Sequence, residues 1–244
     1  MLNYLFDGSF DGLMTVIYES YYKHQVPDNI IIKGELQQNM LSQNIYIETD
    51  IEKSEKVQNA IKNKISRESL KNIFYAYLSE LDSSYILIYK YIRMGFKLGK
   101  KIDNYLSNET VFNVHKIRQK VSHESHKMIE LIRFKEIKKG LYYAKIHPDY
   151  NVLCLIVPHF ASRFQNQYFM INDIRRNITA IYDKNDWIIT DMLPENIMLT
   201  NDEENYENLW KVYYENIAIK ERKNPRLQRQ NMPKKYWDLL VEKS

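Results

Sequence analysis

Three groups of side chains in this sequence are candidates for catalysis, metal binding or the binding of a charged ligand. The first is a pair of carboxylates, Asp7 and Asp11, on either side of the step from an expected strand to a helix. Two carboxylates at a strand end can bind Mg²⁺ or activate water. An aspartate beside a glycine at a helix start is more often a cap or turn residue. We favour the cap or turn interpretation.

The second candidate is Glu124, which stands on the apolar seam of an expected helix where a hydrophobic residue is typical. A carboxylate in such a place must be paired or carry a raised pKa. The expected partners are the nearby His126, Arg133 and Arg163. We favour a buried structural ion pair over a poised acid or base.

The third group is a basic carboxy-terminal arm. Residues 220–244 contain eight Lys or Arg and three acidic residues, a net charge of +5, whereas residues 1–219 carry −1. Guanidinium groups suit bidentate phosphate binding, amides can reach base edges, and aromatic rings offer stacking surfaces. A second basic set recurs at helical spacing. The expected nucleic-acid contacts are Arg222, Lys223, Asn224, Arg226, Gln228, Arg229, Lys234 and Lys235 in the arm, and Lys90, Arg93, Lys97 and Lys101 on the helix.

The same charges have a second interpretation. The helix face can simply be solvated, and the arm can dock on an acidic partner protein or wrap around its own core. Charge alone does not separate these alternatives from binding to a polyanion, which gains affinity from phosphate neutralisation and counterion release.

Composition excludes several classes of function. With 244 residues, 44% of them hydrophobic and 27% charged, the chain is typical of a globular protein. The single cysteine, Cys154, excludes a disulfide framework and any iron–sulfur cluster held by this chain alone. The spacing His123-Glu-Ser-His126 is wrong for a zincin, and no metal or other cofactor is expected here. The longest apolar run, residues 152–158, is too short to span a membrane, and without a secretion signal we expect a cytosolic protein.

Hydrophobic periodicity predicts one α+β unit over residues 1–244, with residues 221–244 as the basic arm. It has a short-stranded amino-terminal part, a helical centre and a small antiparallel sheet. The expected strands are 2–6, 29–32, 45–48, 141–146, 168–172, 179–182 and 187–190. The expected helices are 10–23, about 70–81, 88–99, 109–132, 149–164 and 203–220. The last helix must end before Asn224-Pro225, and an extended segment then runs to Pro233, where a short helix begins.

The chain resembles, from end to end, a bacterial family of unknown-function proteins assigned to DNA metabolism or DNA repair. The residues that carry the resemblance are 4–12, 95–100, 124–126, 133–134, 159–164, Asp173 and 221–237. The sequence departs from the family at Ile129-Glu130-Leu131 and at Phe169, where tryptophan is common. These departures leave the fold expectation unchanged and weaken any assignment of chemistry to the helix that carries Glu124.

The resemblance implies a partner and a pathway. Family members are encoded beside a radical-SAM protein with a helix-hairpin-helix element, and some relatives are fused to a uracil-DNA glycosylase-like domain. The iron–sulfur cluster and S-adenosylmethionine are then expected in that partner. The leading hypothesis is therefore a DNA-binding accessory protein that works with a radical-SAM enzyme. The alternatives are a glycosylase or metal-dependent nuclease using Asp7, Asp11, Glu124 or His159, and a protein-binding adaptor.

Overall fold

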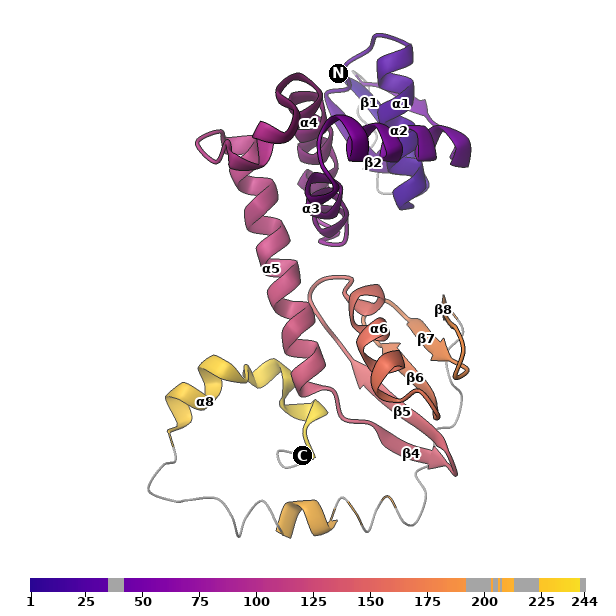
Figure 1. The fold of residues 1–244 in the computed structure, drawn as a ribbon, viewed down its shortest axis with the longest axis vertical. Coiled ribbons are helices and arrows are strands. Elements are labelled where there is room, and N and C mark those ends of the chain that lie inside the picture. The colour runs from indigo at the N-terminus through magenta and orange to yellow at the C-terminus, as the bar shows by residue number, and fades with distance from the viewer. Residues whose placement is uncertain (35–41, 192–202, 204–205, 207, 213–223, 242–244) are drawn as a thin grey trace. The chain divides into compact units, whose positions relative to one another are not determined.

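The structure is a computed structural model, and it describes residues 1–34, 42–191, 203, 206, 208–212 and 224–241 (Figure 1). The chain divides into two compact units, Met1–Ser122 and His123–Ser244. We call them the amino-terminal and the carboxy-terminal unit. Each contains one sheet and several helices, so the expected α+β class is confirmed.

The amino-terminal unit is built on a parallel sheet of three strands. Strands β1 (Leu2–Phe6), β2 (Asn29–Ile32) and β3 (Gln43–Tyr46) pair in the order β2-β1-β3. Helix α1 (Phe10–Tyr22) connects β1 to β2, because parallel neighbours need a crossover between them. Strand β3 begins two residues earlier than expected.

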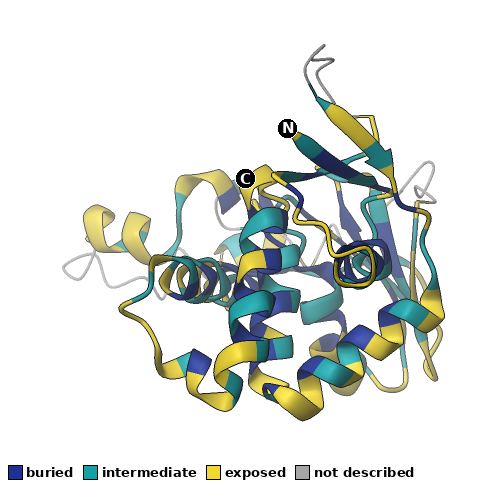
Figure 2. Ribbon diagram, turned by 90° about the horizontal axis from the view of Figure 1, so that it is seen from above, coloured by how far each residue is buried: buried dark blue, intermediate teal, exposed yellow. Residues whose placement is uncertain are grey.

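Four helical segments follow β3 in this unit. They are α2 (Ile51–Lys64), α3 (Arg67–Tyr77), α4 (Asp82–Leu98) and the 3-10 helix η1 (Gly99–Asn104). Each of these segments carries both buried and exposed residues, and Figure 2 colours the ribbon by burial. Helix α4 lies close to the end of α2 because Gly95 has no side chain, and a Cβ there would lie 2.5 Å from Cδ1 of the buried Ile65.

Helix α5 (Glu109–Leu131) starts in the amino-terminal unit and continues into the carboxy-terminal unit. Its bounds agree with the helix expected over 109–132. Along the predicted seam, Val114, Val121 and Met128 are fully buried. Glu124 is buried on the same helix, as its seam position predicted.

The carboxy-terminal unit contains a five-stranded sheet in the order β4-β5-β6-β7-β8. The strands are β4 (Lys135–Lys138), β5 (Leu141–Ile146), β6 (Tyr168–Asp173), β7 (Ile178–Tyr182) and β8 (Trp187–Thr190). Three pairings are antiparallel, as expected, and the β5–β6 pairing is parallel. Helix α6 (Leu153–Arg163) makes the crossover between β5 and β6 and packs against β6, β7 and β8.

The carboxy-terminal arm, residues 224–241 in this structure, is helical where an extended segment was expected. Helix α8 (Pro225–Asn231) begins at a capping residue, because Asn224 Oδ1 accepts a hydrogen bond from the amide of Leu227 at 3.1 Å. The Asn-Pro pair that ends a preceding helix thus also starts a new one, with proline in the first turn. The short helix expected after Pro233 is present as the 3-10 helix η3 (Lys234–Leu239).

The helix predicted over 203–220 lies largely outside the described residues. Within its described part, Leu209, Trp210 and Val212 are exposed, with exposed fractions of 63%, 43% and 57%.

Candidate nucleic-acid interface

The arm is attached to the carboxy-terminal unit through the buried carboxylate of Glu124. One oxygen, Oε1, accepts hydrogen bonds from the amide of Asp149 at 2.9 Å, from Lys235 Nζ at 3.4 Å and from the Tyr236 hydroxyl. The other oxygen, Oε2, accepts from the amide of Tyr150 at 2.8 Å. Glu124 is only 6% exposed, so all four donors stabilise a charge that is removed from water.

Glu124 forms an ion pair, as we favoured, but with a different partner, and only the carboxylate is buried because the Lys235 side chain is 41% exposed. His126 and Arg163 are exposed, and Arg133 donates to the carbonyls of Glu130 and Ile132. The cation comes instead from Lys235, 111 residues further along the chain. Sequence spacing on α5 could not reveal a partner so distant in sequence.

Three further contacts complete this attachment, which we call the arm anchor. Lys235 also pairs with the carboxylate of Asp149. His147 Nε2 lies 2.9 Å from Asp238 Oδ1, and its ring stacks on Tyr236 with centroids 5.7 Å apart. Burial, followed by the hydrogen bond to Glu124, holds the pKa of Tyr236 well above its usual range, so the phenol remains a donor. The arm anchor fixes η3 and leaves Lys235 engaged with two carboxylates.

Helix α8, in contrast, presents its cations to solvent. None of its residues is buried, and both Arg226 and Arg229 are exposed. Arg229 Nε donates to the carbonyl of Pro225 at 3.1 Å. Within the residues that the structure describes, neither guanidinium pairs with a carboxylate. In the part of the chain that the structure describes, both side chains face solvent.

The other arm residues expected to contact nucleic acid differ in position. Lys234 is exposed and lies over the Trp237 ring at 5.8 Å, and Gln228 is half-buried. Asn224 is exposed, but its side-chain oxygen is used as the helix cap. Arg222 and Lys223 lie outside the described residues.

The expected basic face on the central helix is present in the amino-terminal unit. Lys90 and Lys97 of α4 and Lys101 of η1 are exposed. Arg93 is half-buried, donates to the Tyr89 hydroxyl at 2.8 Å and lies 5.5 Å from the centroid of the Tyr21 ring. Its guanidinium packs between tyrosines, so the solvent-facing set consists of the three lysines.

Asp7 has the contacts of a turn residue. Its carboxylate accepts hydrogen bonds from the amide and hydroxyl of Ser9, at 2.9 and 2.7 Å, and from the Thr49 hydroxyl at 2.8 Å. Burial alone would raise the pKa of Asp7, but these hydrogen bonds outweigh it and hold the pKa below its usual value. A Cβ on Gly12 would lie 2.2 Å from Asp7 Oδ1, so this glycine makes room for the turn.

The other two catalytic candidates, Asp11 and His159, lie in different units of the chain. Asp11 Oδ1 accepts from the hydroxyl of Ser54 at 2.6 Å and from Gln58 Nε2 at 3.3 Å, which joins α1 to α2. His159 is exposed on α6, with its ring edge-to-face against Phe160. In the described part of the chain, no group of three or more His, Cys, Asp or Glu could hold a metal ion.

The comparisons with known proteins identify a family. A domain of unknown function, DUF4130, matches residues 82–242, and the chain belongs to this family. The matched range starts with α4 and includes the basic face, the arm anchor and α8. No curated protein and no solved structure matched the chain. In the described residues, no helix has the length and apolarity needed to cross a membrane.

The residues that hold the arm have no signature in the sequence. Asp149 and His147 lie between β5 and α6, and no spacing relates them to residues 235–238. For the aromatic residues of the arm, Tyr236 among them, only stacking was expected. The one usable signal was a carboxylate on an apolar seam, which indicates that a donor must come from elsewhere in the fold.

Proposed function

We propose that this protein is a DNA-binding accessory subunit for DNA repair or base processing, and that it works with a radical-SAM iron–sulfur protein. The observation that supports DNA binding most directly is the contrast within the arm. Lys235 is paired with carboxylates of its own unit, whereas Arg226 and Arg229 on α8 have no such pairing in the described residues. The arm is held at η3 and leaves a cationic helix exposed beside it.

The chemistry of these residues determines the kind of binding expected. Guanidinium groups bind phosphate oxygens in bidentate geometry, which gives affinity with little sequence preference. Lys90, Lys97 and Lys101 form a second row of cations in the other unit. Binding through such contacts releases counterions, so affinity falls steeply as salt increases.

The partner is proposed from the family resemblance and from one constraint of this sequence. An iron–sulfur cluster needs several thiolates, and this chain has one cysteine. The cluster and S-adenosylmethionine would therefore be held by the partner, and this subunit would present the DNA to it. Affinity purification from the host tests this part, because recovery of an iron–sulfur protein is the expected result and its absence contradicts the partnership.

A salt titration tests DNA binding. Fluorescence anisotropy of a labelled duplex measures the dissociation constant of the wild type and of Arg226→Gln/Arg229→Gln between 50 and 200 mM salt, the range over which such contacts lose affinity steeply, by orders of magnitude (~10³). The double variant should bind more weakly, and its log–log slope should be smaller by about 1.8, or about 0.9 for each lost phosphate contact.

The matched control is Lys139→Gln/Lys145→Gln, which removes two exposed cations from the same unit. Its affinity should remain close to that of the wild type. A flat salt response of the wild type, or equal losses in both double variants, contradicts binding through α8. Capture of an acidic protein through α8 without any DNA affinity would identify the adaptor instead.

A further inference from the structure

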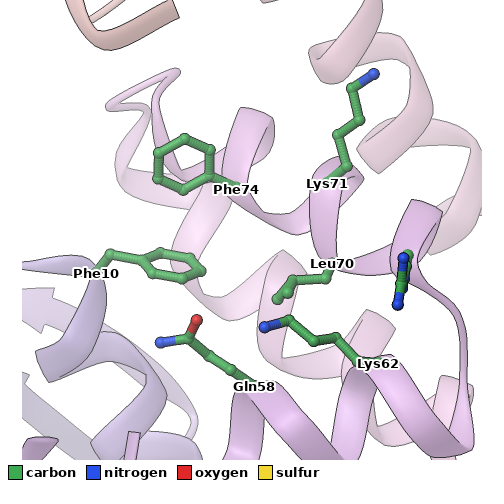
Figure 3. Close-up of a pocket in the computed structure, with 7 residues that line it drawn as sticks. Phe10, Gln58, Lys62, Leu70, Lys71 and Phe74 are labelled. Atoms are coloured by element: carbon green, nitrogen blue, oxygen red, sulfur yellow. The ribbon is translucent and has the colours of Figure 1, made fainter. Parts of the chain in front are cut away.

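The amino-terminal unit contains a pocket of about 410 Å³ (Figure 3). None of its lining residues belongs to the arm or to the basic face of α4. It lies at the start of α1 and along α2 and α3, outside the range that matches the family. Its size falls in the range of roughly 300–1,000 Å³ that is common for small-ligand sites. The lining residues are Phe10, Gln58, Lys62, Arg67, Leu70, Lys71 and Phe74.

The apolar part of this pocket consists of two phenyl rings and a leucine. Phe10 and Phe74 meet edge to face with centroids 5.2 Å apart, and Leu70 lies beside them (Figure 3). Tyr77 packs on both rings, and its hydroxyl donates to the carbonyl of Gly8 at 2.8 Å. The rings are thus held in position before any ligand arrives, and each is only partly buried.

The polar part of the pocket is cationic. Lys62, Arg67 and Lys71 line it, and none of the seven lining side chains is acidic. The Lys62 ammonium points into the space beside Leu70, whereas Lys71 extends away from Phe10 (Figure 3). In the described residues, Lys62 and Arg67 have no carboxylate partner. Two cations therefore face a partly aromatic pocket without internal neutralisation.

Gln58 adds an oriented amide to this pocket. Its Nε2 donates to Asp11 Oδ1 at 3.3 Å and to Ser54 Oγ at 3.0 Å. These bonds fix the amide, and its oxygen is turned toward Phe10 (Figure 3). A fixed carbonyl oxygen is a hydrogen-bond acceptor for a ring N–H or an exocyclic amine.

We propose that this pocket binds one unstacked nucleotide of single-stranded DNA, with its base against Phe10 and Phe74 and its phosphate at Lys62 and Arg67. A small anion alone would leave the aromatic surface unused, and an uncharged apolar ligand would leave the cations unused. Bases in a duplex are stacked on their neighbours, so only an unpaired or extruded base reaches such a surface. The inference rests on the proposed DNA-binding function and specifies how a single strand is held.

Paired variants test the pocket on the full chain, with fluorescein-labelled oligothymidylate and a labelled duplex as probes. Phe74→Leu keeps apolar volume and removes the flat ring, and Lys62→Gln/Arg67→Gln removes the unpaired cations. Each should weaken single-strand binding by about 10-fold, and duplex affinity should change by less than about twofold, since the duplex is bound through phosphate contacts elsewhere.

The controls remove equivalent groups away from the pocket. Phe112→Leu alters an exposed ring on α5, and Lys56→Gln/Lys120→Gln removes two exposed lysines of the same unit. Both controls should bind the single strand like the wild type. Melting temperatures measured by circular dichroism identify any variant that fails to fold. If Phe74→Leu unfolds, Lys62→Gln/Arg67→Gln still provides the test, because both of these residues are exposed.

The outcomes separate this inference from the function on which it rests. If single-strand affinity is unchanged in both pocket variants, or falls equally in the controls, the pocket does not bind nucleotides. If the wild type binds duplex through Arg226 and Arg229 but no single strand, the pocket inference fails and the proposed function stands. If it binds neither probe, both fail.

Discussion

At the scale of single residues, Glu124 shows how a buried charge can organise a segment far away in sequence. Its two oxygens accept from two backbone amides, a lysine and a tyrosine. The backbone donors come from the turn before α6, and the side-chain donors come from η3. The carboxylate therefore joins α5, that turn and the arm, and its removal should affect stability more than chemistry.

The prediction is that Glu124→Gln destabilises the carboxy-terminal unit. An amide of the same shape has one acceptor oxygen, so its NH₂ group must face donors that the carboxylate satisfied. Leaving buried donors unsatisfied in this way costs about 2 kcal/mol. Urea denaturation followed by tryptophan fluorescence measures the loss, because all three tryptophans lie in this unit. Glu130→Gln, an exposed position on the same helix, should change the free energy of unfolding by less than about 0.5 kcal/mol.

Cys154 allows a second prediction at this scale. Burial raises the pKa of its thiol from 9.0 to about 11. At pH 8 the folded protein then contains about 100-fold less thiolate than a thiol of ordinary pKa, and only the thiolate reacts with disulfide reagents. The rate at which the Cys154 thiol reacts with an aromatic disulfide can be followed by the absorbance of the released aromatic thiolate. The reaction should be slow in the native state and fast in urea. Equal rates in both conditions would show that the thiol is accessible and ordinary.

At the scale of elements, α8 is unusual because it forms without burying any residue. Short helices gain most of their stability from packing. Because α8 buries no residue, its stability must come from interactions at its ends. Asn224 caps its first turn, and Pro225 fixes the backbone of the first helical position. Its helical form therefore depends on local sequence and on η3, which the arm anchor holds.

This dependence separates two roles of Asn224, which was first considered as a contact to base edges. Asn224→Ala removes the cap, worth about 1 kcal/mol, and should fray α8 and weaken DNA binding severalfold. Asn224→Ser keeps a capping oxygen and loses the amide, so it should bind like the wild type. Amide exchange of residues 225–231 and anisotropy measure the two effects. Weak binding by Asn224→Ser with an intact helix would show that the amide itself contacts DNA.

The elements that sequence patterns could predict are those with a wide apolar face. Helices α1 and α5 and strands β1, β2 and β5 follow the expected bounds closely. Strand β8 also does, although none of its residues is buried, because its Trp187-Ile-Ile-Thr190 run consists of strand-forming residue types. Helix α2 was not predicted because its buried face is narrow and includes Ser54, which is satisfied by Asp11. Strand β4 and helix α8 have no buried residue, and β4 also lacks a run of strand-forming residues like that of β8, so neither element is signalled by its sequence.

Of the candidate site, only the concentration of positive charge could be predicted from the sequence. The concentration of Lys and Arg in the arm is visible in the sequence, but which cations remain available is decided by contacts between distant residues. Lys235 and Arg229 look equivalent in sequence. The fold pairs Lys235 with Glu124 and Asp149 and leaves Arg229 exposed.

At the scale of the whole molecule, the two cationic surfaces lie in different units. One consists of Arg226 and Arg229 on α8, and the other consists of Lys90, Lys97 and Lys101 on α4 and η1. Changes in binding free energy at independent sites are additive. When both surfaces contact one nucleic acid, the numbers of counterions that they release also add.

This additivity predicts how the salt dependence of duplex binding changes when one or both surfaces are altered. Lys90→Gln/Lys97→Gln/Lys101→Gln should lower the salt slope of duplex binding by about 2.7, the α8 double variant by about 1.8, and their combination by about 4.5, at about 0.9 for each phosphate contact. Titrations of the four proteins against one labelled duplex, with Lys139→Gln/Lys145→Gln as the control for net charge, give the slopes. If the triple variant keeps the wild-type slope, α8 alone meets DNA and the lysine face of α4 is a solvated surface. If the combination loses no more than one of its parents, the two surfaces compete for the same phosphates instead of binding side by side.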